Sequence, residues 1–178
     1  MSDGKPLSLL KPNIVLTGMP GAGKSTVGVI LAKEFCFSFL DTDILIQQSE
    51  GIMLQEIIDT RGLEHFLAIE ERFVTGFNAR NTVIAPGGSV VLSAACMSSL
   101  RETGIMVFLD VPLPTIRSRI NEYTRGIVKR PGYTIEDVWT QREPLYRSTA
   151  DITVDCRLMS QMETASLIAD ELRRNWWC

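Results

Sequence analysis

Residues 18–26 read Gly18-Met19-Pro20-Gly21-Ala22-Gly23-Lys24-Ser25-Thr26, which is the spacing of a phosphate-binding P-loop. The glycines let the backbone curl so that its N–H groups point at a polyphosphate. Lys24 supplies a positive charge for the β- and γ-phosphates, and the Ser25 hydroxyl can ligate Mg²⁺. A chance glycine-rich turn is the alternative, but the flanking segments 13–17 and 26–35 are typical of the strand and helix that a P-loop requires. The sequence therefore predicts binding of a nucleoside triphosphate.

The bulk composition is that of an ordinary globular domain. The 178 residues are 45% hydrophobic and 22% charged, which fits one domain spanning residues 1–178. A net charge of −3 argues against a nucleic-acid-binding protein. No apolar run approaches the roughly 20 residues that span a bilayer, and no signal-peptide pattern is present. The four cysteines are far apart, as in proteins with free thiols. We expect a cytoplasmic monomer with a small-molecule substrate and no nucleic-acid or membrane partner.

Short β-rich segments alternate with longer helical patterns along the chain. This alternation predicts an α/β fold in which helices cover a parallel sheet. Strands are expected at 13–17, 37–40, 82–85, 105–110 and 152–154. Helices are expected at 26–35, 54–77 with a break near 61–62, 93–101, 113–121, 135–147 and 160–174.

Two acidic residues, Asp41 and Asp43, follow the second expected strand. Ligands of an open parallel sheet collect at the carboxyl ends of its strands, so this pair should lie near the P-loop. In an extended chain the two side chains would point the same way. One carboxylate would serve Mg²⁺, and the other would orient an acceptor hydroxyl and receive its proton. The alternative is that Asp43 merely caps the next helix.

Further along the chain, Gly87-Gly88 follows the third expected strand. A glycine pair allows close approach of the backbone to a ligand, although a simple turn is an equal alternative. The basic segment 124–134 contains Gly126 and Pro131 and is predicted to be an exposed, flexible lid. Such a lid could deliver Arg130 to the phosphates on closure, whereas a solvated surface loop is the competing interpretation.

Arg142 lies on the helix that leaves this lid. Its planar guanidinium could hold a substrate carboxylate through two hydrogen bonds. A surface ion pair with Glu143 or another neighbour is the alternative.

Taken in order, these motifs resemble the shikimate kinase family of P-loop kinases, from about Asn13 to Asp155. The resemblance rests on the P-loop, Asp41-Thr42-Asp43, Pro86-Gly87-Gly88, Arg130-Pro131 and Arg142-Glu143-Pro144-Leu145-Tyr146. It implies a five-stranded parallel sheet and phosphorylation of the 3-hydroxyl of shikimate by ATP with Mg²⁺.

The resemblance also implies a role for each matching residue. Asp41 and Ser25 would hold the metal, Asp43 the acceptor hydroxyls, and Arg142 the shikimate carboxylate. The nucleotide would be bound by Gly18, Gly21, Ala22, Gly23, Lys24, Ser25, Thr26, Arg125 and Arg130. Gly87 and Gly88 would contact the acceptor, and Lys24, Asp43 and Arg130 would take part in catalysis.

Two positions depart from the family pattern. Leu67 stands where the family has an arginine that also grips the acceptor, and Ser89 stands where the family usually has a third glycine. Loss of one charge-assisted hydrogen bond would cost roughly 1.5–3 kcal/mol, or about 10- to 100-fold in affinity. Glu70, which could pair with that arginine, loses its partner, unless a lysine or arginine from elsewhere in the chain supplies one. Neither Arg61 nor Arg72 lies at a position on the helix that would replace it.

Three functions are consistent with these residues. A shikimate kinase is the first expectation, and a kinase for another small hydroxylated metabolite is the first alternative. A catalytically silent nucleotide-binding regulator is the third. Acceptor-stimulated ATP turnover would separate an enzyme from a regulator.

Overall fold

The computed structural model describes residues 11–120 and 127–176. Its five strands form one parallel sheet in the order β2-β3-β1-β4-β5. The strands are β1 (Asn13–Thr17), β2 (Ser38–Asp41), β3 (Thr82–Ala85), β4 (Gly104–Asp110) and β5 (Ile152–Asp155). The predicted fold class, with a five-stranded parallel sheet, is confirmed.

Helices follow the strands in the expected alternation. They are α2 (Lys24–Phe35), α3 (Thr42–Glu50), α4 (Leu54–Arg61), α5 (Leu63–Thr75), α6 (Ala94–Thr103), α7 (Leu113–Arg119), α8 (Ile135–Thr149) and α9 (Gln161–Asn175), with a short 3₁₀ turn η1 (Val90–Leu92). The break between α4 and α5 falls at Gly62, as predicted. No helix was predicted at 42–50, so α3 corrects that prediction.

The core lies around the two central strands, β1 and β4. Every residue of β1 is buried, as is every residue of β4 except its last. Helix α2 packs against α9 and β3, whereas α6 and α8 contact β4. Helices on the faces of a parallel sheet bury its strands, which explains their continuous apolar sequences.

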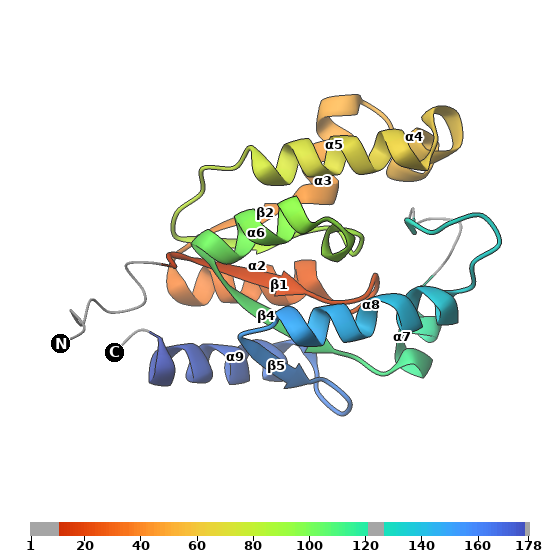
Figure 1. The fold of residues 1–178 in the computed structure, drawn as a ribbon. Coiled ribbons are helices and arrows are strands. Elements are labelled where there is room, and N and C mark those ends of the chain that lie inside the picture. The colour runs from red at the N-terminus through yellow and green to blue at the C-terminus, as the bar shows by residue number, and fades with distance from the viewer. Residues whose placement is uncertain (1–10, 121–126, 177–178) are drawn as a thin grey trace.

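A second, smaller apolar cluster stands apart from the sheet. In Figure 1, α4 and α5 lie at the opposite end of the molecule from α9, with α3 beside them. The cluster joins these three helices to one residue of the segment after α7. Its buried members are Ile46, Leu54, Ile57, Phe66, Ile69 and Val128. This group of helices forms one wall of the cavity described below.

Within residues 11–120 and 127–176, none of the helices combines the length and apolar character needed to cross a membrane. Cys36, Cys96 and Cys156 are free thiols. Near the chain end, Trp176 packs against the main core, with the Lys11 ammonium 5.7 Å from its ring centroid.

Candidate active site

The P-loop connects the end of β1 to the first turn of α2. Gly21 and Gly23 have φ angles of 81° and 98°, which side-chain-bearing residues rarely adopt. The Lys24 ammonium donates hydrogen bonds to the backbone carbonyls of Gly18 (2.9 Å) and Met19 (3.2 Å). The lysine cation therefore lies over the loop, and the N-terminus of α2 directly follows that loop. Together they form a site suited to phosphate.

Asp41 occupies the junction between β2 and α3. One carboxylate oxygen accepts the Ser25 hydroxyl at 2.6 Å. The other accepts the backbone N–H groups of Asp43 (3.0 Å) and Ile44 (3.3 Å), so Asp41 is the N-cap of α3. The predicted extended geometry of the Asp41/Asp43 pair is therefore wrong, because Asp43 lies in the first helical turn. The alternative is wrong as well, since Asp41 and not Asp43 caps the helix.

A cavity of about 570 Å³ lies between the P-loop, α3 and the segment after β3. Predicted site residues from four separate parts of the chain meet in its lining. These are Gly21, Gly23, Lys24, Ser25, Thr26, Asp41, Asp43, Gly87, Gly88 and Arg142. Gly18 and Ala22 are buried within the P-loop itself.

The Gly87-Gly88 pair is packed tightly between side chains. A Cβ atom on Gly87 would collide with the Glu70 carboxylate and lie 2.9 Å from Asp43 Oδ1, and one on Gly88 would lie 2.9 Å from Pro20. The Gly87 N–H donates to the Thr42 hydroxyl at 2.9 Å. The absence of a Cβ at both positions allows these close approaches.

Glu70 lies on α5 directly behind this glycine pair, with only 2% of its surface exposed. The Ser89 hydroxyl lies 2.8 Å and 2.6 Å from its two carboxylate oxygens and donates to them. Burial raises the pKa of Glu70 to about 7. The Ser89 hydrogen bond, Arg142 and Lys24 lower this pKa, whereas Asp43 raises it.

Arg142 on α8 forms another part of the cavity wall and is 2% exposed. Its Nη2 donates to the carbonyl of Val128. Within the described part of the chain, its Nε and Nη1 have no hydrogen-bond partner. The alternative of a surface ion pair with Glu143 is wrong, because Glu143 instead pairs with Arg147 at 2.7 Å. A buried guanidinium with two unsatisfied donors is suited to an anionic ligand.

The predicted lid is only partly exposed. Arg130 is exposed and is not among the residues that line the cavity. Ile127 and Val128 are buried, which corrects the expectation of a wholly exposed loop. Arg125 lies outside the described residues.

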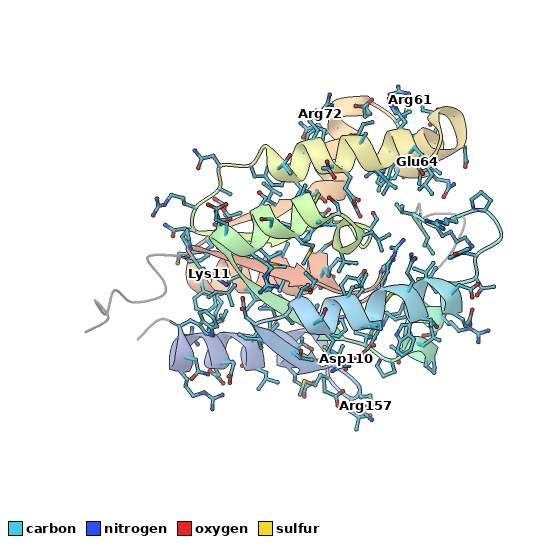
Figure 2. The ribbon with its side chains drawn as sticks, in the orientation of Figure 1. Lys11, Arg61, Glu64, Arg72, Asp110 and Arg157 are labelled. Carbon is cyan, nitrogen blue, oxygen red and sulfur yellow. The ribbon has the colours of Figure 1, made fainter. Side chains whose placement is uncertain are left out.

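Position 67 offers no cation to the cavity. Leu67 is half-buried and packs against the smaller apolar cluster. Arg61 pairs with Glu50 at 2.5 Å, and Figure 2 shows Arg61 and Arg72 at the outer edge of α4 and α5. Neither arginine replaces the missing one.

Several residues around the site had no role in the sequence analysis. The Tyr146 hydroxyl donates to the Gly88 carbonyl at 2.5 Å, so it fixes the glycine pair from α8. Its position one helical turn after Arg142 was the available signal. Other cavity-lining residues sit on α3 and at the start of α4, and their sequence carries no motif. They include Ile44, Gln47, Met53 and Gln55.

Similarity to known proteins identifies the family of this chain. The family model described as shikimate kinase matches residues 20–173. The chain belongs to the shikimate kinase family.

Individual relatives agree with this result. The shikimate kinase of Sulfurihydrogenibium sp. (strain YO3AOP1) is 32% identical over 162 residues, which cover 90% of this chain and 95% of the relative. That of Caldanaerobacter subterraneus subsp. tengcongensis is 37% identical over 147 residues, covering 80% and 85% of the two chains. Among solved structures, the shikimate kinase from Acinetobacter baumannii in complex with shikimate superposes with a TM-score of 0.86. It is 28% identical, and the match covers 93% of this chain and 94% of that one. The predicted resemblance and the predicted class of ATP-dependent kinase are thereby confirmed at the level of the family.

Proposed function

We propose that this protein is a shikimate kinase, which transfers the γ-phosphoryl group of ATP to a hydroxyl of shikimate. The observation that carries the proposal is the Arg142 guanidinium, buried in the wall of the cavity that also contains the P-loop. Two of its nitrogens have no hydrogen-bond partner within the described residues. A carboxylate on the acceptor would satisfy them and would hold that acceptor in the same cavity as the phosphates.

The nucleotide is assigned to the P-loop side of the cavity. Residues 18–26 would surround the ATP phosphates, with the Lys24 cation beside them. Ser25 and Asp41 fit Mg²⁺, because a hydroxyl and a carboxylate 2.6 Å apart in the lining of the cavity would supply oxygen ligands. When bound, Mg²⁺ offsets the charge of the phosphate oxygens. Arg130 would reach the phosphates from the lid, and Arg125 remains a candidate nucleotide contact.

The acceptor is assigned to the side formed by α3, the glycine pair and α8. Arg142 would hold its carboxylate, and the backbone of Gly87 and Gly88 would lie against its ring. Asp43 would orient the reacting hydroxyl and take its proton. A bond then forms between the acceptor oxygen and the γ-phosphorus, the bond from that phosphorus to the β–γ bridging oxygen breaks, and ADP leaves.

Leu67 favours a second candidate, a kinase for another small hydroxylated metabolite. An acceptor that is bound through a single arginine would not bind more weakly because of Leu67. The family match and the buried Arg142 support shikimate as the first acceptor to test.

The direct test is identification of the product. We expect that incubation with Mg²⁺-ATP and shikimate gives shikimate that carries one added phosphoryl group, as detected by mass spectrometry. The variant Lys24→Ala should form none, because it lacks the cation beside the transferred group. Phosphorylation of a different hydroxylated acid, with none of shikimate, would favour the second candidate. ATP binding without phosphorylation of any acceptor would indicate a regulator.

We further propose that the chain functions as a single domain, as a monomer and in the cytoplasm. The three free thiols among the described residues are consistent with a reducing compartment.

A further inference from the structure

Two serine–glutamate hydrogen bonds connect α5 to the segment that follows β3. Ser93, the N-cap of α6, donates to the exposed Glu71 at 2.6 Å. Ser89 donates to the buried Glu70 from the cavity wall itself. The two bonds link the same pair of elements, but only the second lies behind the acceptor side of the cavity.

Glu70 is unusual because it is an acidic side chain that is almost completely buried. An ionised carboxylate at 2% exposure normally requires a cationic partner, yet no ion pair of Glu70 occurs in the described ranges 11–120 and 127–176. The Ser89 hydroxyl is the side-chain donor that satisfies it. Its carboxylate also occupies the space that a Cβ on Gly87 would take, next to Asp43. The carboxylate therefore packs directly against the backbone at Gly87, and the Thr42 and Tyr146 hydroxyls hold the glycine pair from other sides.

We propose that Ser89 is a positioning residue: its hydroxyl holds the Glu70 carboxyl behind Gly87 and thereby fixes the acceptor side of the cavity, which a cation at position 67 would otherwise do. The inference rests on the proposed function, since it concerns how the acceptor side is held. Position 67 precedes Glu70 by three residues on α5, a spacing at which helical side chains meet. Leu67 cannot pair with the carboxylate, and Ser89 reaches it instead from across the cavity wall.

Other charged groups around Glu70 do not replace this contact. Asp43 on α3, Arg142 and Tyr146 on α8, and Lys24 of the P-loop are coupled to it electrostatically, as is the Cys96 thiol on α6. The charged side chains of α4 (Glu56, Asp59 and Arg61) are exposed. Within the described residues, none of these groups is hydrogen-bonded to the Glu70 carboxylate, whereas Ser89 in the segment after β3 is.

The test is a double-mutant cycle on the kinase reaction. Ser89→Ala should raise the KM for shikimate by about 10-fold, the lower end of the range for loss of a hydrogen bond to a charged group, because Ser89 acts only through Glu70; the KM for ATP should stay unchanged. In the Leu67→Arg background, Ser89→Ala should change the KM for shikimate by no more than about 2-fold, because the new cation then pairs with Glu70 in place of the serine hydroxyl. Ser93→Ala is the matched control, which should lower the melting temperature through loss of a helix cap and leave both KM values unchanged.

Three results would overturn the proposal. These are an unchanged KM for shikimate in Ser89→Ala, an equal rise in Ser93→Ala, and an effect of Ser89→Ala that is just as large in the Leu67→Arg background. Should the wild-type protein not phosphorylate shikimate at all, the proposed function fails, and the Ser89 contact is then tested without activity. Carboxyl ¹³C NMR should show the pKa of Glu70 rising in Ser89→Ala but not in Ser93→Ala, and an unchanged pKa would refute the contact.

Discussion

The ionisation of one buried residue, Glu70, makes the stability of the folded protein depend on pH. Its pKa is about 7 in the folded protein, against 4.5 for an exposed glutamate, chiefly because burial disfavours the charged form. Between these two values the folded state binds more protons than the unfolded state. The free energy of unfolding therefore falls as pH rises from about 4.5 to 7, and the full cost of the buried charge is present above pH 7.

The variant Glu70→Gln tests this account. It keeps an oxygen for the Ser89 hydroxyl but cannot ionise, so it should be more stable than the wild type at pH 8, by on the order of 2–3 kcal/mol. At pH 4.5 the two proteins should be nearly equal. Urea unfolding at both pH values measures the difference. Glu64→Gln, on the exposed surface of α5 (Figure 2), is the control and should show no such pH dependence. A stabilisation of the same size at both pH values would refute the buried charge as its cause.

Among the elements, α8 carries a buried cation that lowers the stability of the protein without ligand but is needed for the proposed binding of the acceptor. Its buried face carries Arg142, and the unsatisfied donors of this side chain cost free energy in the protein without ligand. Helix α8 begins with a capping box at Thr134 and Asp137, which fixes its first turn independently of Arg142. The helix should therefore persist when the cation is removed.

Replacement Arg142→Met should separate these effects. We expect the free energy of unfolding to stay the same or to rise by about 1 kcal/mol, because the buried charge is lost. The KM for shikimate should rise about 10- to 100-fold, because the carboxylate loses its partner. Chemical denaturation and steady-state kinetics measure the two quantities.

Arg147→Met is the matched control on the same helix. Arg147 pairs at the surface with Asp110 and Glu143, so its loss should weaken stability slightly and leave the KM for shikimate unchanged. An unchanged KM in Arg142→Met would contradict the assignment of the acceptor carboxylate to this residue.

The elements differed in how far the sequence could predict them. The strands were predictable because a parallel sheet buried on both faces produces continuous apolar runs such as Ile105 to Leu109. Helix α3 was not, since it buries only Thr42 and Ile46 and has no apolar stripe. Its start is set by the Asp41 side chain, and the same aspartate was interpreted only as a metal ligand. The motif indicated a metal-binding role for Asp41, but nothing in the sequence indicated that the same side chain caps a helix.

At the scale of the whole molecule, the location of the site followed from topology. The P-loop, Asp41 and Gly87 come after β1, at the end of β2 and after β3, and strands of a parallel sheet end at one edge. The burial of Arg142 and the Ser89–Glu70 contact were not predictable in this way. They depend on how α8 and α5 pack against the segment after β3, and helix packing of this kind leaves no local sequence pattern. The partial burial of the lid was not predictable either, because it results from packing of Val128 in the smaller apolar cluster.

The most direct test of the central claim is an ADP-release assay with Mg²⁺-ATP, run with shikimate and with no acceptor. We expect strong shikimate-dependent turnover, in which Arg142 binds the acceptor carboxylate without a cation at position 67. Turnover no higher than that without acceptor, in protein that still binds ATP, would contradict the assignment of shikimate as its substrate.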